Sequence, residues 1–177
     1  MPSVTVVRTY LEQRSRSEAT SAPADSPEVR VVRVLEPDVA LFRQLYRDVG
    51  GPYHWRDRNA LSDDTLRAHF QSPDVELWVL YDRDTPAGFF ELQRHSDSSV
   101  EIVYFGLVST VFGRGLGKHL LTRAVEQAWA LNGNRVWLHT CTLDAPSALP
   151  NYLARGFEPF KTEVYETTIP EPPDAGA

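Results

Sequence analysis

The 177-residue chain has a single cysteine, Cys141, and no run of 18 or more apolar residues. One cysteine excludes an intramolecular disulfide framework and a cysteine-rich zinc site. Without a long apolar run, the sequence predicts no transmembrane helix. Basic residues are also few, because 18 Lys and Arg stand against 24 Asp and Glu, which gives a formal net charge of −6. This acidic balance disfavours DNA or RNA as the main partner.

The first residues contain no basic stretch followed by a long apolar segment, so we expect no signal peptide and a cytoplasmic protein without a membrane partner. Apolar residues make up 42% of the sequence, which is enough to bury the core of one domain. We therefore expect residues 1–177 to form a single domain. The stretch 12–28, rich in Ser, Ala, Pro and charge, is expected to be a mobile loop, and 170–177 a frayed tail.

Hydrophobic periodicity and turn residues predict seven strands and four helices. The middle of the chain contains hairpins, which favour antiparallel pairing, whereas the strand–helix–strand unit at 100–140 favours one parallel, right-handed crossover. The expected fold class is α/β (α+β), a mixed, mostly antiparallel twisted sheet with helices on both faces. The strands are expected at 4–11, 29–35, 75–81, 87–94, 100–108, 135–140 and 157–168, and the helices at 38–50, 62–72, 115–132 and 146–155.

The strongest local motif is Phe112-Gly113-Arg114-Gly115-Leu116-Gly117-Lys118, between a predicted strand and a predicted helix. Its glycines allow backbone to approach a ligand closely, and the free N–H groups of a helix N-terminus bind anions. Arg114 and Lys118 add two cations, so a phosphate-bearing ligand is favoured over a bare turn. A Walker P-loop is excluded because Phe112 and His119 stand where it needs Gly and Ser or Thr. The dinucleotide pattern Gly-x-Gly-x-x-Gly fails at Lys118.

These residues resemble the GNAT superfamily of acyl-CoA-dependent N-acetyltransferases, in particular uncharacterised bacterial members. Arg114-Gly115-Leu116-Gly117 matches the centre of the family signature Gln/Arg-x-x-Gly-x-Gly/Ala, although Phe112 replaces the usual Gln or Arg. A second block, Ala148-x3-Tyr152-x3-Gly156-Phe157, matches the family's last helix, although Ala145 stands where Asn is often found. The resemblance covers roughly residues 29–168 and implies a GNAT-like fold.

The resemblance also implies a function. It is the direct transfer of an acetyl group from acetyl-CoA, used as a co-substrate and without a metal, to a primary amine of a small molecule, amino acid or peptide. In the family, the glycine loop holds the CoA pyrophosphate. The residues implied to bind the cofactor there are Gly113, Arg114, Gly115, Leu116, Gly117 and Lys118.

Amine acylation needs a base, because a protonated alkylamine with a pKa of about 10 is not a nucleophile. Glu101 is the candidate. Strict alternation would place it on one strand face with Val103, Phe105 and Leu107, where an apolar environment would raise the pKa of the carboxyl. Its spacing to Arg114-Gly115 resembles that of the catalytic Glu of the histone acetyltransferase branch, without implying a histone substrate. A solvated glutamate is the alternative.

Other groups could take the same proton or complete the transfer. Glu91, Asp144 and a water relay compete with Glu101 as the base. Tyr152 is the candidate acid, since a phenol can protonate the departing thiolate and this Tyr lies near the CoA sulfur in the resembling motif; a core Tyr with a satisfied hydroxyl is the alternative. Backbone N–H groups at Leu107 and Val108 are expected to face the thioester carbonyl, because family members splay this strand from the next.

Tyr53, His54 and Trp55 lie where the family's first inter-helix loop forms the acceptor pocket, and their rings could hold an amine by cation–π contact. Packing under a long loop is the alternative. Glu91 and His139 are further candidates for substrate binding. A catalytic Cys141 would need a third group to orient the Cys–His pair, and none is evident. A metal site formed by His54, His139, Cys141 and Asp144 lacks the spacing that is typical of metal ligands.

Two rival functions remain. The absence of the usual Gln or Arg and of the Asn allows a CoA-binding or sensor module without turnover, and the acyl group could differ from acetyl. The sequence does not identify the amine acceptor. A homodimer formed through the final strand is possible on this sequence.

Overall fold

The computed structural model describes residues 3–16 and 26–169. Within them lie seven strands and four α-helices, as predicted, together with two short 3₁₀ helices, η1 (Gly51–Tyr53) and η2 (Ser109–Val111). The strands are β1 (Ser3–Gln13), β2 (Val29–Arg33), β3 (Val75–Asp82), β4 (Thr85–Arg94), β5 (Ser99–Leu107), β6 (Arg135–Cys141) and β7 (Glu158–Thr168). The helices are α1 (Val39–Gly50), α2 (Asp63–Gln71), α3 (Leu116–Ala130) and α4 (Ala148–Ala154).

Side-chain caps explain where the first two helices begin. The Asp38 carboxylate accepts a hydrogen bond from the Leu41 N–H at 2.9 Å, and the Ser62 hydroxyl accepts one from the Thr65 N–H at 3.1 Å. These bonds satisfy backbone donors that have no partner inside the helix. The predicted cap of the second helix is confirmed.

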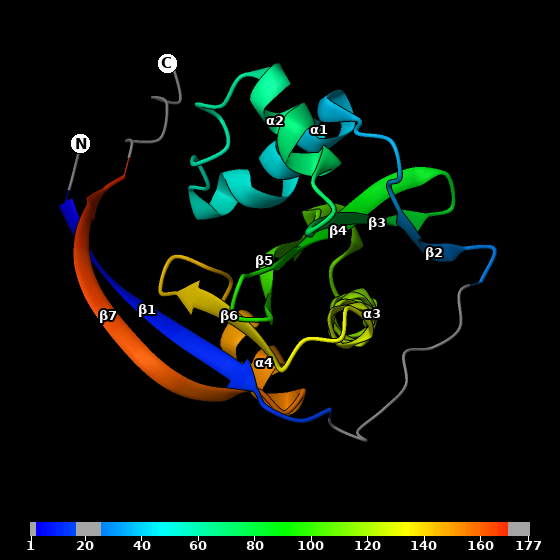
Figure 1. The fold of residues 1–177 in the computed structure, drawn as a ribbon. Coiled ribbons are helices and arrows are strands. Elements are labelled where there is room, and N and C mark those ends of the chain that lie inside the picture. Colours follow the sequence, from blue (N-terminus) through cyan, green and yellow to red (C-terminus); the bar gives the residue numbers. More distant parts are fainter. Residues whose placement is uncertain (1–2, 17–25, 170–177) are drawn as a thin grey trace, which may run out of the picture.

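The strands form one sheet in the order β2-β3-β4-β5-β6-β1-β7. Among the described strands only β5 and β6 pair in parallel; every other neighbouring pair is antiparallel. Helices α1 and α2 cover one face, and α3 and α4 lie on the other (Figure 1). The predicted fold class, a mixed and mostly antiparallel sheet with helices on both faces, is confirmed, as is the parallel crossover at 100–140.

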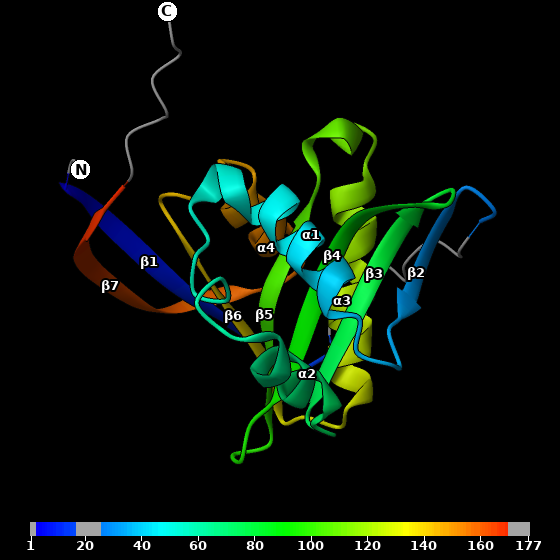
Figure 2. The same cartoon turned by 90° about the horizontal axis from the view of Figure 1, so that it is seen from above.

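The position of β1 is the main feature that the sequence did not indicate. This strand lies between β6 and β7, although it comes first in the chain (Figure 2). It extends to Gln13, so the start of the predicted loop at residue 12 is wrong. Glu12 is held in place because Arg135 of β6 donates to its carboxylate at 2.8 Å. Residues 17–25 of that loop, and the predicted tail at 170–177, lie outside the described residues.

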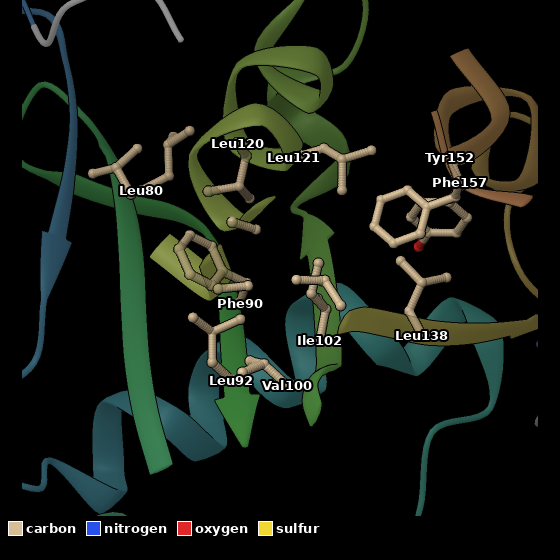
Figure 3. Packing of buried hydrophobic residues seen from close by; sticks show 14 of the residues in the cluster. Leu80, Phe90, Leu92, Val100, Ile102, Leu120, Leu121, Leu138, Tyr152 and Phe157 are labelled. Atoms are coloured by element: carbon tan, nitrogen blue, oxygen red, sulfur yellow. The ribbon is translucent and has the colours of Figure 1, made fainter. Parts of the chain in front are cut away.

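Two clusters of buried side chains hold the layers together. The smaller one lies under α1 and α2 and includes Phe42, Leu45 and Tyr46. The larger one joins the sheet to α3 and α4. Figure 3 shows Leu80 at one end of the larger cluster and Tyr152, Phe157 and Leu138 at the other, with Leu120 and Leu121 of α3 above the strands. The two clusters fix the sheet between its helices, so the strand ends that carry the site are rigidly held.

Candidate active site

Strands β5 and β6 touch along only a short part of their length. Their parallel pairing covers Ser99–Glu101 of β5 and Arg135–Trp137 of β6, and beyond these residues the strands diverge (Figure 2). A cavity of about 1000 Å³ lies where they separate. We call it the central cavity. Its walls come from β5, β6, the start of α3, α4, the segment after α1, the middle of β1 and the end of β7.

The glycine loop brings the start of α3 to this cavity. Gly113 and Gly115 have φ angles of +78° and +76°, a left-handed conformation that residues with a side chain rarely adopt. Gly115 is the N-cap residue of α3 and no side chain caps the helix, so the backbone N–H groups of its first turn have no partner within the helix. A Cβ on Gly117 would have only Leu107 Cδ1 nearby, at 3.8 Å.

This opening fits an anionic group. Gly113, Gly115, Leu116, Gly117 and Lys118 all line the central cavity. The free N–H groups and the positive end of the helix dipole favour negative charge such as a pyrophosphate. Lys118 adds a cation that has no ion pair within the described part of the chain.

Arg114 is placed differently from its neighbours. Its guanidinium points to the end of β3 and makes a bidentate ion pair with Asp82, with 3.0 Å between Nη2 and Oδ1. The Arg114 hydrogen bond lowers the pKa of the Asp82 carboxyl. The side chain lies outside the lining of the central cavity. Of the two cations expected at the opening, the structure therefore places only Lys118 there.

Tyr152 of α4 lines the central cavity and is only 7% exposed. Its ring packs against Phe105 and Phe157, with 6.2 Å between ring centroids in each pair. Burial raises the pKa of the phenol, so the hydroxyl keeps its proton at neutral pH. Within residues 3–16 and 26–169 no hydrogen bond to this hydroxyl is formed. The group is thus a proton donor available to a ligand.

The two backbone donors predicted at the end of β5 point in opposite directions. The Val108 N–H donates to the Ala87 carbonyl at 2.9 Å, so it is occupied, and the expectation that it faces a thioester is wrong. Leu107 pairs with Gly88 between such bonds. Because hydrogen-bonding direction alternates along a strand, the Leu107 N–H turns away from β4 and toward the gap between β5 and β6.

A β-bulge in β5 changes which side chains share a face. Glu91 of β4 pairs with Tyr104, but the next residue, Leu92, pairs with Ile102, so Val103 is an extra residue. Ile102 belongs to the core cluster under α3, whereas Tyr104 packs into the cluster under α1 and α2. Strict alternation therefore fails across this strand.

Glu101 consequently lies on the α1–α2 side, and its predicted placement on one face with Phe105 and Leu107 is wrong. Its carboxylate accepts a hydrogen bond from His95 Nε2 at 2.8 Å. Burial raises the pKa of this carboxyl, and the His95 hydrogen bond partly opposes the rise. Glu101 lies outside the lining of the central cavity, so the structure does not bring it to the candidates that line the cavity.

Glu91 is fully buried and also lies outside the cavity lining. Its Oε1 accepts hydrogen bonds from Arg58 Nη2 at 2.7 Å and from His69 Nε2 at 2.6 Å. Arg58 follows the aromatic segment after α1, and its guanidinium lies 5.3 Å from the Tyr104 ring centroid. Through Arg58, Glu91 of β4 thereby attaches this segment to the sheet.

The aromatic residues predicted for the acceptor pocket do reach the central cavity, since Tyr53, His54 and Trp55 all line it. The Trp55 ring lies 5.0 Å from that of Tyr104 and 5.6 Å from that of Tyr46. The segment therefore packs on the sheet, as one alternative predicted, and its residues also line the cavity; that their rings hold an amine stays a prediction.

On the β6 side, His139, Cys141 and Asp144 line the cavity. Desolvation, followed by the charge of Arg8, lowers the pKa of the His139 imidazole, so it is neutral at pH 7. Desolvation and Asp144 raise the pKa of the Cys141 thiol, which disfavours a thiolate nucleophile. Asp144 Oδ2 accepts bonds from Thr140 Oγ1 at 2.6 Å and from the Cys141 N–H at 2.9 Å. The described residues contain no group of three or more His, Cys, Asp or Glu placed to hold a metal ion.

Arg8 and Tyr165 are among the lining residues that the sequence analysis missed. Arg8 of β1 and Tyr165 of β7 reach the cavity, and Arg8 Nη2 donates to the Tyr165 hydroxyl at 3.2 Å. Nothing local in the sequence distinguishes them. Their place at the cavity depends on the position of β1 between β6 and β7.

Residues 42–157 match the family described as Acetyltransferase (GNAT) family. The chain belongs to this family. The match starts within α1 and ends after α4, so β1, β2 and β7 lie outside the part of the chain that the GNAT comparison covers. The predicted family is confirmed.

A mycothiol acetyltransferase of Corynebacterium efficiens is 32% identical over 111 residues, which are 59% of this chain and 36% of that protein. The chain thus spans about a third of the length of this relative. Among solved structures, a GCN5-related N-acetyltransferase from Kribbella flavida has a TM-score of 0.60 at 18% identity, over 90% of this chain and 56% of that one. An acetyltransferase of Bacillus subtilis in complex with CoA has a TM-score of 0.53 at 22% identity, over 73% and 76%.

These similarities extend the GNAT fold beyond the matched segment, because the Kribbella structure covers most of the chain. Among the described residues, no helix is both long and apolar enough to cross a membrane.

Proposed function

We propose that this GNAT protein is an acetyl-CoA-dependent N-acetyltransferase that moves the acetyl group directly to a primary amine. One observation carries the proposal: the uncapped start of α3 and the free hydroxyl of Tyr152 open into the same cavity. An anion-binding helix end and a proton donor are what a phosphate-bearing thioester requires. That a structurally similar acetyltransferase is in complex with CoA supports the choice of cofactor.

The chain's own groups suit each part of the cofactor. The first-turn N–H groups of α3 and the Lys118 ammonium would hold the phosphates. The edge of β5 that faces β6 has no strand partner beyond Glu101, so its backbone could pair with the amide-bearing arm of CoA. When bound, the thioester supplies an activated acetyl carbon. The protein's part is to orient the amine toward that carbon and exclude water from it.

The reaction forms one C–N bond and breaks one C–S bond. Negative charge develops on the carbonyl oxygen, and the Leu107 N–H, turned toward the gap between β5 and β6, is the donor placed to stabilise it. The leaving thiolate takes a proton from the Tyr152 hydroxyl. An ammonium acceptor loses two protons as it becomes an amide: the base takes one, and the other passes to solvent and balances the proton that Tyr152 gives.

Two groups are proposed for that base, and the geometry separates their roles. Glu101, the base predicted from the sequence, lies outside the cavity lining and would need a water relay. His139 lines the cavity and has a lowered pKa, so its neutral imidazole can accept a proton directly at pH 7. The position of His139 on the cavity wall favours it as the base.

The deciding experiment is thiol release from acetyl-CoA with a panel of primary amines that includes amino acids, peptides and polyamines. Turnover with any amine supports the proposal. A folded protein that binds acetyl-CoA and releases no thiol with any of them would instead be the CoA-binding or sensor module. Propionyl-CoA and longer acyl-CoAs in the same assay decide whether the transferred group is acetyl. We also propose the predicted homodimer, with β7 as the edge strand that would form it, and sedimentation analysis tests it.

A further inference from the structure

We propose that the amine acceptor also carries a carboxylate, and that Arg8 binds this carboxylate in the central cavity. The inference rests on the proposed function and names the substrate class for the same site. It starts from Arg8, a cation on the cavity wall that forms no ion pair within 4.0 Å with a carboxylate of the described residues.

The fold brings Arg8 to the acceptor side of the site. In β1, Arg8 pairs with Cys141 of β6 on one side and with Glu163 of β7 on the other. Leu138 belongs to the core cluster under α3 and α4, so the alternating residues His139 and Cys141 face the opposite side of the sheet. Arg8 shares that face. We call Arg8, His139, Cys141 and Tyr165 the acceptor wall, and all four line the central cavity.

The acceptor wall and the proposed phosphate site lie on different faces of the sheet. Helix α3 packs on one face, whereas the acceptor wall faces the side of α1 and α2, toward which β1 and β7 bend (Figure 1). Trp55 and Tyr104 pack on that same side. The anion that Arg8 would bind is therefore better assigned to the acceptor than to the phosphates of CoA.

Arg8 is a half-buried guanidinium whose hydrogen bond and ring contact are both with the neutral Tyr165, while the charge of Glu163 acts on it from beyond ion-pair distance. Nη2 donates to the Tyr165 hydroxyl at 3.2 Å, and the guanidinium carbon lies 4.9 Å from the centroid of that ring. Its Nε is buried and has no hydrogen-bond partner. Within the described residues, no carboxylate lies within 4.0 Å of Arg8. A buried charge is costly unless it is paired, and a guanidinium offers five donors in a planar fork that suits a carboxylate.

The nearby carboxylates are already engaged. Glu163, opposite Arg8 in β7, accepts a bond from the Tyr10 hydroxyl at 2.8 Å and pairs with Lys161 Nζ at 2.6 Å. Asp144 is bonded to Thr140 and to the Cys141 N–H. Asp57, from the segment after α1, lines the cavity as an acidic group that an ammonium could meet. The cavity therefore offers separate places for the amine and the acid of one acceptor.

The test compares matched acceptors that differ only in this group. L-amino acids and their C-terminal amides, and dipeptides with free or amidated C-termini, are assayed by thiol release from acetyl-CoA. The wild-type protein should prefer the acids, and Arg8→Gln should lower the acid-to-amide ratio of kcat/KM by about 10- to 100-fold, the range for a lost charge-assisted hydrogen bond. The loss should lie mainly in KM, and Arg8→Lys should restore part of the ratio. The two acceptor series decide between a free amino acid and a peptide terminus.

Two controls make the outcome decisive. Arg47→Gln, on the exposed side of α1 and outside the cavity lining, should leave the ratio unchanged. Calorimetry should show the same acetyl-CoA affinity for Arg8→Gln as for the wild type, which also proves folding. Equal use of acids and amides by the wild type, or an equal loss for both in Arg8→Gln, overturns the inference while the proposed function stands. If no amine releases thiol, the proposed function fails and the inference fails with it.

Discussion

Tyr152 concentrates several requirements of the reaction in one side chain. The ring is part of the core, held between Phe105 and Phe157, while the hydroxyl is left for a ligand in the cavity. Its burial keeps the phenol protonated. A hydroxyl that is held rigidly and donates no hydrogen bond within the described part of the protein can act as an acid without a rearrangement of the site.

Tyr152→Phe therefore removes the proton and leaves the packing. We expect kcat to fall by about 10²- to 10⁴-fold, the usual range for general acid–base catalysis, with acetyl-CoA affinity nearly unchanged. Steady-state kinetics and calorimetry measure the two quantities. Tyr81→Phe is the matched control, because Tyr81 packs against the core cluster under α1 and α2 and lies outside the cavity lining. Full turnover in Tyr152→Phe would remove this residue from the mechanism.

The base can be identified from pH profiles. A base works only when deprotonated, so kcat/KM falls as the pH drops below its pKa. The pKa of His139 lies below the usual 6.5, so with His139 as base this limb lies below pH 6.5 and His139→Gln should remove it. Turnover of that variant should recover at high pH, where the amine loses its proton unaided. If instead Glu101→Gln lowers neutral-pH activity more than His139→Gln, the relay to Glu101 is the correct path.

Helix α3 contributes through its first turn rather than through its length. Gly115, the N-cap residue, is in the left-handed conformation and has no side chain that could cap the helix. The backbone N–H groups of the first turn of α3 therefore stay available. The space over Gly117 is open, with Leu107 Cδ1 at 3.8 Å as its nearest neighbour. A side chain there would fit the folded protein but would occupy the place proposed for phosphate.

Gly117→Val should thus fold and lose at least about tenfold in acetyl-CoA affinity, or more than about 1.4 kcal/mol. Calorimetry gives the affinity, and thermal unfolding monitored by circular dichroism checks the fold. Gly51→Val is the matched control, because a Cβ there meets nothing within 4 Å and the residue lies outside the cavity lining. Unchanged affinity in a folded Gly117→Val would move the phosphate site elsewhere.

Elements defined by local rules were predicted from the sequence, whereas features defined by pairing were not. The Ser62 cap, the apolar stripe of α3 and the alternating strands follow from spacing along the chain. The bulge at Val103 depends on how β4 meets β5, so alternation alone put Glu101 on the wrong face. Arg114 turned to Asp82 because β3 ends beside the glycine loop, which no motif encodes. The role of Arg8 depended on the place of β1 between two strands from the other end of the sequence.

At the scale of the whole molecule, the negative net charge of the protein disfavours binding of the proposed cofactor, which is itself an anion. The chain has a formal net charge of −6, so a phosphate-bearing ligand is repelled at a distance and must be held by local groups. Arg114 is neutralised by Asp82, which leaves Lys118 as the cation on the cavity side of the loop.

Lys118→Gln should accordingly weaken acetyl-CoA binding, and the loss should shrink between about 50 mM and about 500 mM salt as screening grows. Arg114→Gln should show a smaller loss at every salt concentration, because its charge is already paired. Calorimetric titrations at three salt concentrations measure both. Equal losses in the two variants would mean that Arg114 leaves Asp82 when the ligand binds.

The insertion of β1 between β6 and β7 determines when β1 can pair during synthesis of the protein. A ribosome produces β1 before both of its partners, β6 and β7, which lie more than a hundred residues further along the sequence. The strand must therefore wait, unpaired, while the intervening elements emerge and collapse around α1 and α3. Closing this sheet brings together residues more than a hundred positions apart, and such high contact order slows folding. An exposed strand edge that waits for its partners is also the kind of surface on which nascent chains engage chaperones.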